Sequence, residues 1–110
     1  MEKNSREIFP GTLDLLILKS LETLKSAHGY TIMESIWNKS GQLFRVEEGA
    51  LYPSLHRMQL KGWLEAEWGV SEANRRAKYY KLTPEGLDQL TSKRTDWDQI
   101  VLGMQRLLET

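Results

Sequence analysis

Residues 69–82 hold a concentration of positive charge in a chain whose formal net charge is zero. Four cationic side chains share this segment with one carboxylate, so that its net charge is +3, whereas residues 84–110 have a net charge of −2. The four cations are Arg75, Arg76, Lys78 and Lys81. Guanidinium and ammonium groups gathered in this way can neutralise phosphates, so the segment predicts contact with a nucleic acid. A solvated loop without a partner is the alternative interpretation.

The segment from Gly49 to Leu64 precedes this charge and has one apolar and one polar face. Leu51, Leu55 and Met58 recur at the spacing of a helix, which predicts that they pack inside. The side chains that fall mostly off this stripe are Tyr52, Ser54, His56, Arg57 and Lys61. A helix that exposes such groups beside a positively charged hairpin is a way of holding DNA.

The polar residues of this helix also have structural interpretations. Arg57 has a planar fork that can read guanine, and Lys61 near the helix end is placed to meet phosphate. Both could instead be surface charges paired with Glu65 or with neighbours one turn away. His56 could be a surface histidine without a role. Tyr52 could pack in the core, although its offset from the apolar stripe leaves its hydroxyl available for DNA.

The residues that enzymes and metal sites need are scarce. The chain has no cysteine, and its two histidines, His28 and His56, fall in different elements without a nucleophile or metal ligand at a recognisable spacing. We therefore expect no catalytic residue, no metal site and no cofactor. No apolar run could span a bilayer, and residues 1–7 lack the basic and then apolar pattern of a secretory signal. These features predict a cytoplasmic protein without a membrane partner.

Three helices are predicted before the hairpin. Residues 12–24 are rich in leucine, and Thr12 can cap their N-terminus. A second helix is expected over residues 30–37. The third should run from near Gly49 to Gly62, because Pro53 lacks the N–H that would bond to a carbonyl four residues earlier and is tolerated only close to a helix start.

Two strands are predicted after these helices. Residues 63–68 alternate between apolar and acidic side chains, and residues 78–83 form the return strand. One face of the first strand carries Leu64, Ala66 and Trp68, and one face of the second carries Tyr80 and Leu82. Residues 69–77 between them should form a long basic loop. Trp63 and Trp68, which flank the first strand, are expected to be packing residues.

The last segment has the pattern of a long helix that packs along a seam. Thr83 can cap it, and Pro84 suits the first helical position. Apolar positions then recur alternately three and four residues apart. The predicted seam comprises Leu87, Leu90, Arg94, Trp97, Val101, Met104 and Leu108. So small a domain has no spare core for this helix, so a second copy of the chain is its expected partner. The chain would then divide into a DNA-binding domain at residues 1–83 and a dimerisation helix at residues 84–110.

This order of elements is that of a winged helix-turn-helix domain, so we expect a mainly α fold of the α+β type with a two-stranded wing and a long C-terminal helix. The chain resembles the PadR family of transcriptional regulators in three segments: residues 28–32, residues 49–58 around the Leu-Tyr-Pro run, and residues 75–86 with Lys-Tyr-Tyr-Lys-Leu-Thr. With a single helix after the wing, it is similar to the short subgroup of that family.

The resemblance implies a homodimeric repressor that binds double-stranded DNA, with its third helix in the major groove and its wing against the neighbouring backbone or minor groove. Carried over by position, the contacts are Tyr52, Ser54, His56 and Arg57 on the helix and Arg75, Arg76 and Lys78 on the wing. Many members have Thr where this chain has Ala50, so any contact of that hydroxyl is absent. Some short members bind planar aromatic compounds at the dimer interface through a Trp that corresponds to Trp97, which implies a ligand role beside dimer packing.

Two classes of function follow from these observations. The first is a dimeric transcription regulator whose recognition helices meet major-groove faces about 34 Å apart, so that its operator is a palindrome. The alternative is a winged-helix module that binds another protein and has no role in ligand or DNA binding. Replacing Arg75 and Arg76 by Ala discriminates between them, because only the first class needs these charges.

Overall fold

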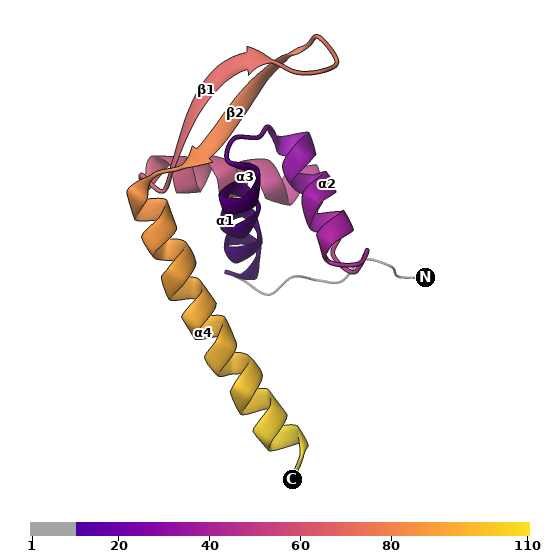
Figure 1. Ribbon diagram of the computed structural model, residues 1–110, viewed down its shortest axis with the longest axis vertical. Coiled ribbons are helices and arrows are strands. Elements are labelled where there is room, and N and C mark those ends of the chain that lie inside the picture. The colour runs from indigo at the N-terminus through magenta and orange to yellow at the C-terminus, as the bar shows by residue number, and fades with distance from the viewer. Residues whose placement is uncertain (1–10) are drawn as a thin grey trace.

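The computed structural model describes residues 11–110, which form four helices and one antiparallel hairpin (Figure 1). In chain order these elements are α1 (Thr12–Leu24), α2 (Gly29–Lys39), α3 (Glu48–Leu60), β1 (Leu64–Val70), β2 (Arg76–Leu82) and α4 (Pro84–Leu108). The first three helices pack together near the base of the hairpin, and α4 runs away from them (Figure 1). The predicted mainly α fold of the α+β type, a winged helix-turn-helix with a long C-terminal helix, is confirmed.

The helices begin close to where the sequence predicts. Thr12 is not the N-cap of α1 as predicted but its first helical residue, because Gly11 occupies the cap position in the left-handed conformation (φ 86°). The helix α3 begins at Glu48, one residue before Gly49, and includes Pro53 in its second turn. The missing N–H of Pro53 therefore removes one hydrogen bond near the start of the helix and does not break it.

The two strands pair in the register that brings their predicted faces together. Leu64 lies opposite Leu82, and Ala66 lies opposite Tyr80. These residues form the side of the hairpin that covers the helical core. The chain enters β1 from α3 through Gly62, whose φ of 83° is a conformation that a residue with a side chain rarely adopts.

The loop of the hairpin is shorter than predicted. Both strands run further, so that residues 71–75 connect them in place of residues 69–77. The Ser71 N–H donates to the Arg75 carbonyl over 2.8 Å, and Asn74 adopts a left-handed conformation (φ 60°) that closes the turn. The cationic residues that follow the loop therefore stand on strand β2.

The core confirms the apolar stripe predicted for α3. Leu51, Leu55 and Met58 are fully buried, together with Ile17 of α1. The same core includes Leu90 of α4, which is only 4% exposed. The sequence assigns Leu90 to the dimer interface, and this assignment is corrected by its burial: the first half of α4 packs on the chain's own core.

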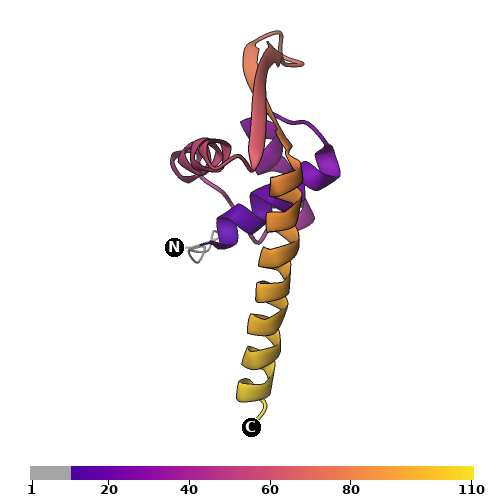
Figure 2. The ribbon, with the colours of Figure 1, turned by 90° about the vertical axis from the view of Figure 1, so that its left-hand side faces the viewer.

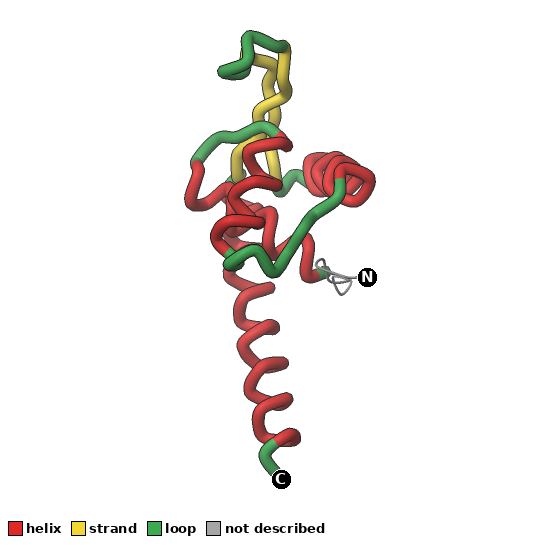
Figure 3. The backbone as a smooth tube through the Cα atoms, turned by 90° about the vertical axis from the view of Figure 1, so that its right-hand side faces the viewer, coloured by secondary structure: helices red, strands yellow, loops and turns green. Residues whose placement is uncertain are grey.

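The start of α4 is as predicted, and its second half stands alone. The Gly86 N–H donates to Thr83 Oγ1 over 3.0 Å, and Pro84 is the first helical residue. Figures 2 and 3 show α4 running on past α1, α2 and α3 from two opposite sides. The expected division at residues 83 and 84 coincides with this cap, but Leu90 shows that the two parts share one core.

Within residues 11–110, no helix combines the length and the apolar character needed to cross a bilayer. The charge pattern of residues 1–7, on which the expected absence of a secretory signal depends, lies outside the described residues. The cytoplasmic location stays a prediction.

Candidate nucleic-acid interface

The outward face of α3 is less polar than the sequence suggests. Its exposed residues include Ala50, Pro53, His56, Arg57 and Leu60. Leu60 is 75% exposed, and such apolar groups can contact the methyl group of thymine. Ser54 is a correction to the predicted groove residues, because it is only 9% exposed and faces inward.

Arg57 is tied to α1 by a bidentate ion pair. Its terminal nitrogens donate to the two carboxylate oxygens of Asp14 over 2.8 and 2.9 Å, and Nη2 lies 3.4 Å from Ser54 Oγ. Asp14 is 5% exposed, while the side chain of Arg57 is 45% exposed. The alternative in which Arg57 pairs with Glu65 is wrong. Glu65 instead forms an ion pair with Lys81, with Oε1 and Nζ 3.8 Å apart.

This pair determines what Arg57 can do. The hydrogen bond to Asp14 raises the pKa of Arg57 above its ordinary value, against a smaller opposing effect of burial. A raised pKa stabilises the fold at all pH values below the ordinary arginine value, so the pair holds α3 to α1 throughout the neutral range. Reading guanine with the whole planar fork would require the pair to open, whereas the exposed part of the guanidinium can meet a phosphate as it stands.

Tyr52 packs over the start of α2. A Cβ added to Gly29 would come within 2.7 Å of ring carbons of Tyr52, so the ring occupies the space that only a glycine leaves free. Burial raises the pKa of Tyr52, and the negative charge of Glu48 adds to this shift. Because Tyr52 is still 44% exposed, the packing interpretation accounts for one side of the ring and leaves another side open.

The predicted wing residues stand on the outer part of the hairpin. Arg75 is exposed in the loop, Arg76 is exposed at the start of β2, and Lys78 is half-buried. The guanidinium carbon of Arg76 lies 4.2 Å from the ring centroid of Trp68, and Lys78 Nζ lies 6.0 Å from it. Trp68 is 55% exposed, so the packing role expected for it is wrong.

Lys61 and Trp63 lie where α3 meets the base of the hairpin. Lys61 is the C-cap that follows α3, and its Nζ lies 4.8 Å from the ring centroid of Trp63. Lys93 of α4 approaches the same ring at 5.4 Å. Trp63 packs against the core, which confirms its expected role. Lys61 is exposed, as a phosphate contact at the helix end requires.

The side of α4 expected to meet a second copy is apolar and exposed. Six large apolar residues on it are between 38 and 78% exposed, the highest value being that of Leu108. These residues are Leu87, Trp97, Ile100, Met104, Leu107 and Leu108. Of the remaining predicted interface residues, Arg94 is exposed and Val101 is half-buried.

A cavity of about 180 Å³ lies between the start of α1 and the middle of α4. Its walls are Gly11, Thr12, Leu15, Lys93, Asp96, Trp97 and Ile100. Sites for small organic ligands span about 300–1,000 Å³. The cavity is therefore smaller than such sites and does not by itself enclose a compound of that size.

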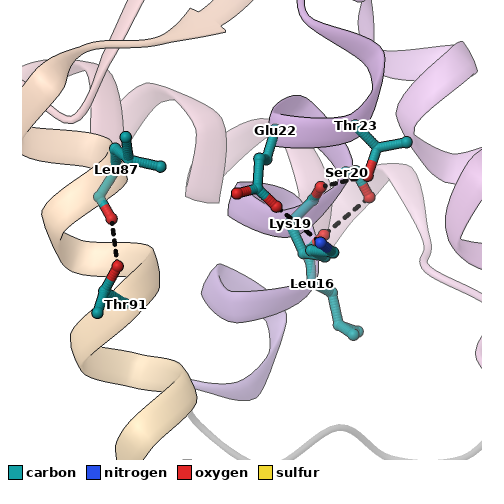
Figure 4. Close-up of polar contacts among 7 residues, drawn as sticks. All are labelled: Leu16, Lys19, Ser20, Glu22, Thr23, Leu87 and Thr91. Carbon is teal, nitrogen blue, oxygen red and sulfur yellow. Dashed lines mark hydrogen bonds and ion pairs between the residues drawn. The ribbon is translucent and has the colours of Figure 1, made fainter.

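Several polar groups of α1 and α4 are satisfied within their own helices (Figure 4). Lys19 Nζ donates to Glu22 Oε1 over 2.7 Å, and this contact is the main cause of the lowered pKa of Glu22. Ser20 Oγ donates to the carbonyl of Leu16 over 2.8 Å, and Thr91 bonds in the same way on α4. Apolar packing therefore makes the main contribution to the contact between the two helices.

The structure gathers the predicted DNA-binding residues at two places. His56, Arg57 and Lys61 lie along α3, and Arg75, Arg76 and Lys78 lie on the hairpin. Two features were not predicted from the sequence: the pairing of Asp14 with Arg57, and the exposed position of Trp68 beside Arg76. An acidic residue in a first helical turn and a Trp at the far end of a strand were visible signals, but both have common local explanations. Among residues 11–110, no three His, Asp or Glu side chains are placed to hold a metal ion.

Comparison with known proteins gives a consistent result. The model of the "Transcriptional regulator PadR-like family" matches residues 17–92, from α1 into the first half of α4. The chain is 38% identical over 65 residues to a transcriptional regulator of Mycobacterium tuberculosis, an alignment that covers 56% of this chain and 60% of that protein.

Two crystal structures of PadR family transcription regulators are similar in fold and sequence. The regulator from Eggerthella lenta is 34% identical with a TM-score of 0.76, and the match covers 91% of this chain and 84% of that chain. The regulator from Clostridium difficile is 33% identical with a TM-score of 0.75, covering 89% of this chain and 99% of that chain.

Proposed function

This chain belongs to the PadR-like family of transcriptional regulators, and we propose that it acts as a homodimeric repressor whose DNA affinity responds to a planar aromatic ligand. Its family makes it a DNA-binding transcription regulator and not an enzyme. The observation that carries the proposal is the exposed apolar side of α4. The alternative, a protein-binding module without a role in DNA binding, has no comparable support in the family.

Dimerisation accounts for the second half of α4. Met104, Leu107 and Leu108 are 54, 69 and 78% exposed on a helix that continues beyond the core. A long amphipathic helix with nothing to cover it is stabilised when it packs along a second such helix. A symmetric pair of α4 helices would bury this surface on both copies at once.

The dimer would place two copies of α3 in successive turns of the major groove, at a palindromic operator. His56, Arg57 and Lys61 would meet the groove and its flanking phosphates, with Tyr52 at the start of the helix. Arg75, Arg76 and Lys78 would contact the neighbouring backbone or minor groove. Such binding prevents other proteins from occupying the same DNA, which is how the regulator would repress.

A DNA titration at several ionic strengths tests this proposal. Each neutralised phosphate contributes about −0.9 to the slope of log affinity against log salt concentration. We expect a steep negative slope, measured by fluorescence anisotropy on operators selected from random DNA. A flat response, or no binding at low salt, would refute DNA binding by this surface.

A charge placed on the apolar side of α4 tests dimerisation. Met104→Lys should produce a monomer in sedimentation velocity, because the ammonium group would be buried in the interface. Gln99→Lys is the matched control, since it adds the same charge to an exposed residue on the opposite side of α4 without removing an apolar one. A wild-type chain that sediments as a monomer would overturn the dimer.

The proposed ligand response uses the cavity beside Trp97. In a dimer, the partner's copy of α4 would supply a further wall, and the ring of Trp97 would stack on a planar aromatic compound. Thr12 and Leu15 line this cavity, and Asp14 between them holds Arg57 of α3. A ligand that moves the start of α1 against α4 would therefore also move α3.

Fluorescence quenching by planar aromatic dyes tests the ligand site. Binding should quench emission in the wild type but not in Trp97→Ala, provided that the variant still sediments as a dimer. Arg57→Lys should reduce the effect of a bound dye on DNA affinity, because a ligand acts only through its different affinity for the two states. Equal quenching in Trp97→Ala would place the dye elsewhere.

A further inference from the structure

Trp68 is exposed in an unusual position on the hairpin. Indole rings are among the most buried groups in folded proteins, yet Trp68 is 55% exposed. It lies on β1 opposite Lys78 of β2, and the next pair on the same face towards the loop is Val70 and Arg76. Val70 is 66% exposed as well. The outer hairpin therefore presents an apolar surface flanked by two cations.

This surface continues the side of the hairpin that covers the core. Leu64 and Tyr80 are buried on that side near the base, and the two-residue alternation places Trp68 further along it. Figures 1 and 2 show the hairpin extending past the helices at this end, which agrees with the 55% exposure of Trp68. The position of Trp68 is thus set by the fold, while its exposure is not explained by packing.

Two cations adjoin the ring. The guanidinium of Arg76 stacks over it at 4.2 Å, and the ammonium of Lys78 lies at 6.0 Å. Stacking restricts the guanidinium to one orientation while leaving the N–H groups at its edge able to donate. An apolar ring bordered by oriented donors is complementary to a nucleic-acid backbone, in which apolar deoxyribose rings alternate with phosphates.

We propose that Trp68 is a DNA-contacting residue of the wing, with its indole packed against deoxyribose at the edge of the minor groove and Arg76 and Lys78 on the adjoining phosphates. This inference rests on the proposed DNA-binding function and adds a contact that the charged residues alone do not provide. Burial of the indole against sugar excludes water from the neighbouring charge contacts and strengthens them. The contact is to backbone, so it increases affinity for every sequence.

A chain with Trp68 as its only Trp tests the contact directly. The variant Trp37→Phe, Trp63→Phe, Trp97→Phe is titrated with a mixed-sequence duplex of about 30 base pairs, roughly three helical turns. Emission from Trp68 should change until the DNA is saturated and should return when salt is added. The matched control is the variant Trp63→Phe, Trp68→Phe, Trp97→Phe, in which Trp37 on α2 is the only Trp of the chain. Its emission should stay constant. No change in Trp68 emission at saturation would overturn the proposal.

A second measurement uses single substitutions in the full chain, in case the triple variant does not fold. Trp68→Ala should weaken binding about tenfold on every duplex, as expected for a buried aromatic contact, and Trp68→Phe should restore most of the loss. If Trp68 only orients Arg76, then Trp68→Ala should have no further effect in the Arg76→Ala background, and this result would also overturn the proposal. A wild-type chain that does not bind DNA would refute the proposed function itself, whereas wild-type binding with a silent Trp68 would refute the wing contact alone.

Discussion

The two surfaces proposed to meet DNA, α3 and the hairpin, hold their arginines in different ways. On α3, Arg57 is hydrogen-bonded through both terminal nitrogens to the buried carboxylate of Asp14. On the hairpin, Arg76 stacks on the exposed ring of Trp68, and no carboxylate within residues 11–110 forms an ion pair with it. This difference indicates that the arginine of α3 fixes the helix in the fold, whereas Arg76 retains its charge for the proposed contact with phosphate.

The largest effect is expected from Arg57→Ala, which leaves Asp14 buried without its partner. An unsatisfied buried group costs about 1–3 kcal/mol, and for this half-exposed arginine we expect a loss of about 2 kcal/mol in the free energy of unfolding. Urea unfolding followed by circular dichroism should show a lower midpoint with an unchanged m value. Arg57→Lys, which keeps the charge but not the fork, should lose less.

The double variant Asp14→Asn, Arg57→Ala provides the control for this prediction. It leaves no charge buried, so it should recover part of the lost stability. A loss as large as that of the single variant would mean that the carboxylate is not the cause. Full stability in Arg57→Ala would contradict the view that the pair holds α3 to α1, and would return Arg57 to the role of a base reader.

The next effect is on DNA affinity and concerns the hairpin. In the double variant Arg75→Ala, Arg76→Ala, the slope of log affinity against log salt concentration should become less negative by about 1.8. Each lost phosphate contact removes about 0.9 from its magnitude. Affinity should fall by up to about tenfold on all sequences, while stability changes by less than about 0.5 kcal/mol. Lys39→Ala, at the end of α2 away from the hairpin, is the control and should leave the slope unchanged. A loss confined to one sequence would mean that the hairpin reads bases.

A smaller effect should distinguish base recognition by α3 from the contacts that attach α3 to the fold. His56 is exposed on the outward face of α3. His56→Ala should leave stability and the salt slope unchanged and reduce discrimination between the selected operator and a single-base variant by about fivefold, or about 1 kcal/mol. Competition binding with the two duplexes measures this ratio. An unchanged ratio would leave base reading to the apolar residues of the face.

Local features of the sequence were sufficient to predict the elements. The Thr83 and Pro84 start of α4, the helix end at Gly62 and the alternation that places Leu64 and Ala66 on one face of β1 depend on neighbouring residues only, and each is confirmed. The loop was predicted too long because charge in residues 69–77 was interpreted as loop composition. Strand pairing satisfies the backbone of those residues in spite of their charge.

Contacts between distant segments were not predictable in the same way. Asp14 and Arg57 are 43 residues apart, and only the packing of α1 against α3 makes them partners. The repeat that contains Leu90 and Trp97 predicts one apolar side of α4, but a repeat does not say whether that side is covered by the same chain or by another. The alternation of β1 likewise assigns Trp68 to a face without showing where the core ends.

The smallest effect is expected from Tyr52→Phe, which removes only the hydroxyl from a ring that lies between α3 and α2. Because the ring already packs over Gly29, stability should change by less than about 0.5 kcal/mol. DNA affinity should fall about twofold if the hydroxyl bonds to a base edge, as the low end of the range for a neutral hydrogen bond allows. Tyr52→Ala is the contrast, since it opens the space above Gly29 and should make Gly29→Ala harmless, whereas Gly29→Ala alone displaces the ring. Unchanged affinity in Tyr52→Phe would make Tyr52 a packing residue and leave the contacts of α3 to His56, Arg57 and Lys61.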